Sequence, residues 1–250
     1  MNKPYLSIIT ITYNAEDYLK DTLQSIKDQT FKDYEYIIID GNSCDGTLDI
    51  IDQYNAYIDI VISEKDSGIY NAMNKGLKLA KGEWVTFLNA GDSYRDENTL
   101  KKIFAQMDPK LKLVYGDWAN IDRNGLFEYM KATTDLKGTL QKNFYICHQS
   151  LFVKNERLPF YDESYRIKAD YQWVIDIVKS VDESEIRYLN SILALYDHEG
   201  LSAKYLITNA REYMRLTYKN FGLFQVIKNS PTYGKYFLKY ILIRMNIYRS

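Results

Sequence analysis

The 250-residue chain lacks the features that mark a secreted or membrane-spanning protein. Its two cysteines, Cys44 and Cys147, provide neither a disulfide framework nor the spacing of a zinc site, which fits a reducing compartment. No apolar run approaches the ~20 residues that a membrane-spanning helix needs. Residues 1–4 lead into a short predicted strand without the apolar segment of a signal peptide. The expected location is therefore the cytoplasm.

The chain also lacks a basic surplus, internal repeats, low-complexity segments and a linker rich in Pro, Gly or Ser. Its formal net charge of −1 argues against a general nucleic-acid-binding protein, because such a protein needs a basic surface to displace counterions. With 46% hydrophobic and 26% charged residues, the chain can bury a full core and remain soluble. These properties indicate a globular protein without a flexible division in its middle.

Hydrophobic periodicity alternates between strand and helix patterns in the first part of the chain. Short apolar runs predict buried strands at residues 5–12, 35–39, 58–62, 84–88 and 112–115. Amphipathic or capped segments between them predict helices at residues 16–29, 47–54, 69–80 and 96–107. This alternation is typical of an α/β fold with a mostly parallel, doubly wound sheet flanked by helices.

The pattern changes after Gly116. Residues 122–125 predict a hairpin turn, and a strand, a helix and a strand are expected at 146–153, 169–178 and 186–196. From residue 205 onward the chain is predicted to be helical and increasingly basic. We therefore expect a catalytic domain over residues 1–204, with halves at about 1–116 and 117–204, and a helical C-terminal region over 205–250.

Polar residues follow three of the predicted strands. The segments concerned are Tyr13-Asn14, Asp40-Gly41-Asn42 and Asn89-Ala90-Gly91-Asp92. In an open α/β sheet the carboxyl ends of parallel strands meet at the edge where ligands bind. Acidic groups at that edge suit a divalent cation and the hydroxyls of a nucleotide ribose.

In their order along the chain, these segments resemble a family 2 glycosyltransferase with the GT-A nucleotide-sugar-binding fold. The resemblance covers about the first 200 residues and is carried by residues 7–14, 40–47, 64–76 and 88–92. It implies an inverting enzyme that moves a sugar from a nucleotide-sugar donor, a UDP-sugar being expected, to a lipid-linked saccharide in bacterial surface polysaccharide synthesis. One departure is visible, because the family's aspartate-rich metal motif is thinned to Asn89-Ala90-Gly91-Asp92 and keeps one carboxylate.

The resemblance assigns donor-side roles residue by residue. The nucleotide-binding residues that it implies are Thr12, Tyr13, Asn14, Asp40, Asp66, Asn74, Lys75, Asn89, Ala90 and Gly91. Asp92 would bind Mn²⁺ or Mg²⁺, an ion that assists departure of the nucleoside diphosphate. His198 lies where such enzymes often place a last metal or pyrophosphate ligand, and it could offset the missing carboxylate. Each carboxylate also has a structural alternative, a turn for Asp40 and a helix cap for Asp92.

On the acceptor side, the resemblance makes Asp170 the candidate catalytic base. An inverting transferase needs one carboxylate to take the proton of the attacking acceptor hydroxyl. A cap at the start of a helix is the structural alternative for Asp170, and the two roles are compatible. The residues expected to line the acceptor side are His148, Gln149, Tyr171 and Trp173. A lone histidine also serves often as a structural residue, so that interpretation stays open for His148 and His198.

The last part of the chain has an unusual charge pattern. Residues 213–250 contain no Asp or Glu, and seven Lys and Arg residues alternate there with aromatic and aliphatic side chains. This pattern predicts helices that lie on an anionic membrane surface, here the inner face of the plasma membrane. The alternative is a basic helix that packs on the domain or on a second copy of the chain as a homodimer.

Two rival functions follow from the same residues. Thinning of the metal motif suits a non-catalytic module that binds nucleotide-sugars or carbohydrates, although Asp92 and Asp170 are retained. A dinucleotide-dependent oxidoreductase is disfavoured because no G-x-G-x-x-G segment follows the first predicted strand.

Overall fold

The computed structural model describes residues 3–121, 127–141, 146–156, 158–197 and 205–244. Within these residues nine strands form one sheet in the order β3-β2-β1-β4-β8-β6-β9-β5, and β7 pairs with β6. The strands are β1 Leu6–Thr12, β2 Tyr34–Asp40, β3 Ile60–Ser63, β4 Trp84–Phe87, β5 Ser93–Tyr94, β6 Leu113–Ile121, β7 Phe127–Met130, β8 Leu151–Lys154 and β9 Ile186–Asp197. The helices are α1 Leu19–Lys27, α2 Thr47–Gln53, α3 Ile69–Leu79, α4 Thr99–Phe104, α5 Leu136–Thr139, α6 Ala169–Ser180, α8 Leu206–Lys228 and α9 Ser230–Arg244, with 3₁₀ turns η1 Asn55–Tyr57, η2 His148–Ser150 and η3 Glu183–Glu185.

The first four strands in chain order are parallel to one another, as predicted. β1 lies between β2 and β4, and Thr12 at its end pairs with Asp40 at the end of β2. Asp40 in turn pairs with Ser63 at the end of β3. The carboxyl ends of these strands therefore meet at one edge of the sheet, where the polar segments were expected to gather.

The second half of the sheet is mixed. β8 is antiparallel to β4 and β6, whereas β6 and β9 are parallel. The predicted hairpin turn at 122–125 lies outside the described residues, but the strands on either side pair antiparallel, with Ile121 opposite Phe127. One predicted strand is shorter than expected, because residues 148–150 form η2 and β8 begins only at Leu151.

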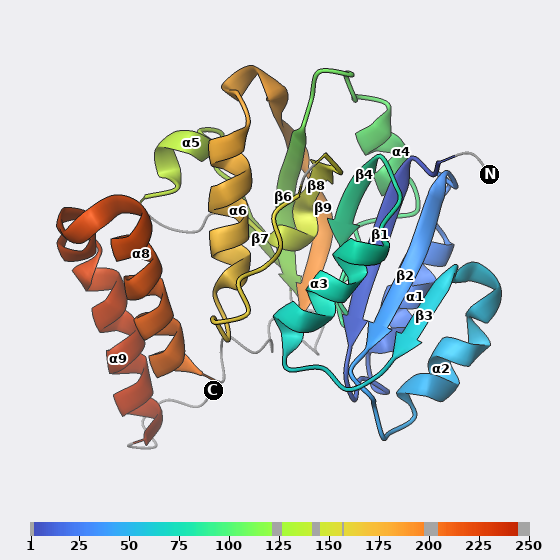
Figure 1. Ribbon diagram of the computed structural model, residues 1–250, viewed down its shortest axis with the longest axis horizontal. Coiled ribbons are helices and arrows are strands. Elements are labelled where there is room, and N and C mark those ends of the chain that lie inside the picture. The colour runs from blue at the N-terminus through green and yellow to red at the C-terminus, as the bar shows by residue number, and fades with distance from the viewer. Residues whose placement is uncertain (1–2, 122–126, 142–145, 157, 198–204, 245–250) are drawn as a thin grey trace.

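The sheet is covered by helices on both faces. Alternate residues of one strand point to opposite faces, so Ile9 packs into one core while Ile8 packs into the other. The first core joins the sheet to α3 and α6, which lie in front of it in Figure 1, and the second joins it to α1, α2 and α4. This layering confirms the predicted α/β class.

The C-terminal region forms a helical hairpin outside α6 (Figure 1). Helix α8 is kinked at Gly222, and α9 packs back along it. Tyr213 of α8 packs on Tyr171 of α6 with ring centroids 5.5 Å apart, so the hairpin extends the main core. No helix in the described ranges is long and apolar enough to cross a membrane. The domain boundary predicted at residue 204 lies outside the described residues.

Candidate active site at the carboxyl ends of the parallel strands

The loops that follow β1 and β2 are locked together at the ligand edge. The backbone N–H of Asn14 donates to Ser43 Oγ at 2.8 Å, and the Asn14 Oδ1 atom accepts from the N–H of Cys44 at 3.0 Å. Asn14 and Asn42 both have positive φ angles, 47° and 66°, which asparagine tolerates better than most residues. Such backbone strain is typical of sites that the surrounding structure holds in place.

Tyr13, Gly41 and Asp66 meet beside these loops. A Cβ atom added at Gly41 would lie 2.7 Å from Asp66 Oδ2 and 3.2 Å from the Tyr13 ring, so a larger residue at position 41 would displace the Asp66 side chain. Asp66 is held in place by the N–H of Gly68, which donates to its Oδ1 at 2.9 Å. The Tyr13 ring is 61% exposed and is therefore available for stacking on a base.

Asp40 is fully buried behind this group. Its carboxylate accepts from the backbone N–H of Ser43 at 3.0 Å and from Ser63 Oγ at 2.6 Å, and also from Ser43 Oγ. These contacts give Asp40 the turn-forming role that was its structural alternative. A direct contact with the nucleotide base stays a prediction.

Two buried polar atoms at this edge have no hydrogen-bond partner among the described residues. They are Thr12 Oγ1 at the end of β1 and Asn89 Oδ1 just after β4. Burial of a polar atom without a partner costs about 1–3 kcal/mol, so native proteins rarely keep such atoms without a ligand or water. Both residues were predicted to face the donor.

The turn from Asn89 to Asp92 is built on α1. The Thr22 hydroxyl donates to the Asp92 carbonyl at 2.7 Å and accepts from the N–H of Gly91 at 3.0 Å. Gly91 has a φ of 96°, a conformation that side chains with a Cβ rarely adopt. The backbone of this turn therefore disfavours a second aspartate at Gly91 and accounts for the thinned motif.

Asp92 is 4% exposed and contacts the next loop. Its Oδ2 accepts from Gln149 Nε2 at 2.8 Å, which ties the turn to η2. Among the described residues no three His, Cys, Asp or Glu side chains gather where they could share a metal ion. The second predicted metal residue, His198, lies outside the described residues.

Asp170 lies in the first turn of α6 and faces His148 of η2. Its Oδ1 accepts from the backbone N–H of Tyr171 at 2.8 Å and from the Tyr70 hydroxyl at 3.3 Å. Its Oδ2 lies 3.8 Å from His148 Nδ1, and His148 Nε2 lies 3.2 Å from Asn89 Nδ2. His148 therefore stands between the candidate base and the donor edge.

The environment of His148 determines where its proton lies. Burial lowers the pKa of His148 below its usual value, although the Asp170 carboxylate acts in the opposite direction. The ring is thus mostly neutral at pH 7 and carries one proton. The tautomer with its proton on Nδ1 suits both neighbours, because Nε2 can then accept from Asn89 Nδ2 while Nδ1 faces Asp170.

Two predicted donor residues make other contacts in the structure. The Asn74 side chain donates to the Tyr161 carbonyl at 3.0 Å and to Glu163 Oε1 at 2.8 Å, and accepts from the Tyr161 N–H at 2.8 Å. Lys75 Nζ pairs with Glu64 at 2.8 Å. Asn74 thus ties α3 to the segment before α6, and Lys75 steadies the loop that contains Asp66.

The expectation for Tyr171 and Trp173 needs correction. The two side chains are 1% and 2% exposed and belong to the core. Trp173 stacks on Tyr161 with ring centroids 4.9 Å apart and donates to the Pro159 carbonyl at 2.7 Å. Sequence reasoning placed both rings beside the acceptor because they follow Asp170, but a helix turns successive side chains to different sides. His148 and Gln149 contact Asp170, Asn89 and Asp92, and their place on the acceptor side stays a prediction.

Thr22 and Tyr70 were not predicted, although both contact the site. Tyr70 lies within residues 64–76, which resemble the family, and this position is the feature of the sequence that indicates its role. Thr22 is an ordinary helix residue in the sequence, and only the packing of α1 on the 89–92 turn reveals its role.

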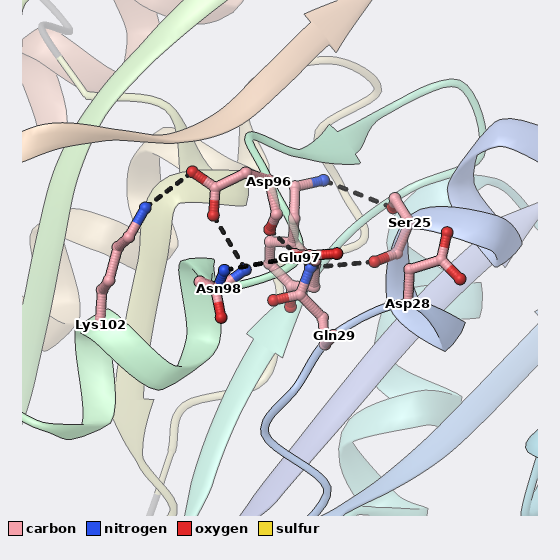
Figure 2. Close-up of a pocket in the computed structure, with 8 residues that line it drawn as sticks. Ser25, Asp28, Gln29, Asp96, Glu97, Asn98 and Lys102 are labelled. Carbon is pink, nitrogen blue, oxygen red and sulfur yellow. Dashed lines mark hydrogen bonds and ion pairs between the residues drawn. The ribbon is translucent and has the colours of Figure 1, made fainter.

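A separate hollow of about 620 Å³ lies between the end of α1 and the start of α4 (Figure 2). Its polar groups bind one another, as Lys102 does with Asp96 at 2.8 Å and Gln29 does with the Asp96 carbonyl at 2.8 Å. None of the predicted site residues lines it. The candidate active site is therefore the strand edge and not this hollow.

Comparison with known proteins identifies the family. The Glycosyl transferase family 2 model matches residues 7–167, well over half of the chain. The chain belongs to glycosyltransferase family 2. A PGL/p-HBAD biosynthesis glycosyltransferase of Mycobacterium bovis is 35% identical to this glycosyltransferase over 209 residues, which cover 80% of this chain and 79% of that protein.

Solved structures show the same fold. The structure of S. aureus TarS 1–349 in complex with UDP-GlcNAc is similar with a TM-score of 0.68 at 21% identity, covering 85% of this chain and 65% of that one. A mannosyltransferase from Pyrobaculum calidifontis in complex with GDP-Man and Mn²⁺ has a TM-score of 0.59 at 18% identity, covering 85% and 63%. This glycosyltransferase thus spans just under two thirds of each solved chain. The predicted GT-A fold is confirmed.

Proposed function

We propose that this glycosyltransferase transfers a sugar from a UDP-sugar, with inversion, to a lipid-linked saccharide during synthesis of a bacterial surface polysaccharide. The observation that carries the proposal is the bridge that η2 makes between the two halves of the site. Gln149 contacts Asp92 at 2.8 Å, and His148 faces Asp170 at 3.8 Å. The metal-side carboxylate and the candidate base are thus held against one short turn.

The donor edge fits a divalent cation in the chemistry of its atoms. The Asp92 carboxylate and the orphaned Asn89 Oδ1 are oxygen ligands, which Mg²⁺ and Mn²⁺ prefer, and substrate phosphates commonly complete such sites. A bound ion would neutralise the charge that develops on the departing nucleoside diphosphate. Because the described residues supply one carboxylate here, we expect the ion to bind well only together with the nucleotide. The mannosyltransferase solved with GDP-Man and Mn²⁺ supports this pairing.

Asp170 performs the chemistry on the acceptor. Its carboxylate takes the proton of the acceptor hydroxyl as that oxygen attacks the anomeric carbon on the face opposite the leaving group, which inverts the configuration. The Tyr171 N–H and the Tyr70 hydroxyl hold Oδ1, and Oδ2 faces His148. Neutral His148 lies beside Asp170 without placing a positive charge against it.

A thermal-shift screen with UDP, GDP and their sugars, each with and without Mn²⁺, tests the donor. A ligand that binds only the folded state raises the apparent melting temperature, and saturation at 100 times Kd stabilises by about 2.7 kcal/mol. We expect UDP and a UDP-sugar to raise the melting temperature more with Mn²⁺ than without it. If GDP stabilises the protein and UDP does not, the donor is a GDP-sugar and not a UDP-sugar. If no nucleotide stabilises the protein, the proposal is contradicted. Stabilisation without turnover would favour the non-catalytic binding module.

The C-terminal hairpin supports docking on an anionic membrane, although not through all of its basic residues. Arg215 lies over the Tyr165 ring at 4.8 Å, and Lys219 lies 3.8 Å from Asp162, so both face the domain. Lys228 and Lys235 are exposed. Exposed apolar side chains accompany them, among which Leu223, Phe224 and Ile227 are 63%, 78% and 61% exposed. These five residues form the docking surface that we propose.

Vesicle sedimentation tests this docking surface. Each lysine near an anionic surface contributes about 1 kcal/mol, and exposed apolar side chains add contact at headgroup depth. We expect the protein to pellet with anionic vesicles, less so at high salt, and to lose most binding in a Leu223→Ser, Phe224→Ser, Ile227→Ser variant. Leu48→Ser, at an exposed apolar position on α2, is the control. Equal pelleting with neutral and anionic vesicles would contradict docking, and a dimer in solution that the triple variant disrupts would make the hairpin a subunit interface.

A further inference from the structure

A residue of the C-terminal hairpin binds the backbone segment that leads into α6. Three successive backbone N–H groups, those of Arg166, Ile167 and Lys168, donate to the carboxylate of Glu212 at 2.7, 2.9 and 3.0 Å. Glu212 stands on α8, more than 40 residues further along the chain. The helix that these groups lead into carries Asp170 in its first turn.

This contact lies at the N-terminal end of α6, where the local sequence offers no side-chain cap. The first N–H groups of a helix have no partner within the helix. Lys168, at the cap position, has no side-chain acceptor and makes no capping hydrogen bond within the described residues. A carboxylate at this end is also favoured by the helix dipole. Glu212 therefore accepts from the N–H of Lys168 at the cap position and of the two residues before it, and it places a negative charge near the start of α6.

Other contacts of α8 hold the same segment against the hairpin. The Arg166 guanidinium donates to the Tyr205 hydroxyl at 3.0 Å, just before α8 begins. Further along the helix, Asn220 Nδ2 donates to Gln172 Oε1 at 2.8 Å, on the second turn of α6. Glu212 is the one among these contacts that binds the backbone directly ahead of Asp170.

We propose that Glu212 is a positioning residue for the candidate base. The inference rests on the proposed role of Asp170. By holding the backbone of residues 166–168, Glu212 sets where α6 begins and therefore where the Asp170 carboxylate lies between Tyr70 and His148. The C-terminal hairpin is then part of the catalytic apparatus, and Glu212 acts without touching the donor or the acceptor.

Two variants of the 250-residue chain test the proposal. Glu212→Ala removes the acceptor atoms, whereas Glu212→Gln keeps one acceptor oxygen and removes the charge. Arg211→Ala, at the exposed neighbouring position on α8, is the matched control. By hydrogen–deuterium exchange we expect Glu212→Ala to speed exchange over residues 166–172 while α1 and α3 keep their protection. Glu212→Gln should lie between Glu212→Ala and the parent, and Arg211→Ala should match the parent. Unchanged exchange over 166–172 in Glu212→Ala would overturn the inference.

A kinetic measurement separates positioning from a general structural role. The reaction is UDP release from UDP-GlcNAc with water as acceptor. We expect Glu212→Ala to lower kcat by about tenfold, as small misplacements of catalytic groups do, and to leave KM for UDP-GlcNAc within about twofold. A rise in KM with kcat unchanged would instead indicate loss of donor binding and would contradict the positioning role.

A double-mutant cycle with Asp170→Asn completes the test. If Glu212 acts through Asp170, Glu212→Ala adds little to the loss already caused by Asp170→Asn. If the two losses multiply, Glu212 acts elsewhere and the inference fails. If Asp170→Asn does not lower kcat, Asp170 is not the catalytic base. If UDP-GlcNAc is not turned over, this enzyme does not hydrolyse that particular UDP-sugar, and the exchange measurement decides whether Glu212 positions α6.

Discussion

Asp92→Asn is expected to abolish the Mn²⁺-dependent part of UDP binding. The substitution keeps the shape of the side chain and an oxygen for the Gln149 amide, but it removes the one carboxylate of the 89–92 turn. We expect a loss of about 100-fold or more in Mn²⁺-dependent affinity, since even partners of metal ligands contribute 10- to 100-fold. The measurement is calorimetric titration of UDP with Mn²⁺ and with EDTA.

The control for this experiment is Asp49→Asn on the exposed surface of α2. It removes the same charge away from the strand edge and should bind UDP like the parent. A folded Asp92→Asn protein that keeps its full Mn²⁺-dependent affinity would show that the ion, or the nucleotide, binds elsewhere. The melting temperature of each variant without ligand establishes that the fold is intact.

Asp170→Asn is expected to lower turnover by about 10²-fold or more while donor binding stays intact, the usual range for loss of a positioned base. An asparagine oxygen still accepts from the Tyr171 N–H and the Tyr70 hydroxyl, so the start of α6 keeps its geometry. The amide cannot take the acceptor proton. Turnover is measured as UDP release, and donor binding as the thermal shift with UDP and Mn²⁺.

Asp176→Asn provides the matched control, because Asp176 lies on the same helix and is exposed. It should leave turnover unchanged. Rates within a few-fold of the parent in Asp170→Asn would make Asp170 a structural residue at the start of α6 and would move the base to another group. A loss of UDP binding in the same variant would point to a donor-side role instead.

Local patterns were sufficient to predict the parallel half of the fold. The apolar runs that became β1, β2 and β4 lie in a regular alternation with amphipathic segments, and each ends in a polar residue. Strand and helix periods are properties of neighbouring residues, so the sequence displays them directly. The family motifs then placed Asp92 at the strand edge and Asp170 at a helix start, where the structure has them.

The run from Ile146 to Val153 shows where local patterns stop being informative. Its composition suits a strand throughout, yet residues 148–150 form η2, because Gln149 turns to Asp92 and His148 turns to Asp170 and Asn89. Those partners lie 22 to 59 residues away in the chain. A strand pattern and a turn with distant partners look alike in the sequence.

The sequence by itself determined the α/β class and the polar segments that follow the parallel strands. It also indicated the two carboxylates on which the proposed chemistry depends. Only the tertiary structure decided that Trp173 is buried, that Asn74 binds Tyr161, and that Glu212 binds the backbone just ahead of the helix of Asp170. The physical reason is that burial and long-range hydrogen bonds depend on which distant segments pack together. Such packing produces no periodic pattern in the local sequence of the two segments that meet.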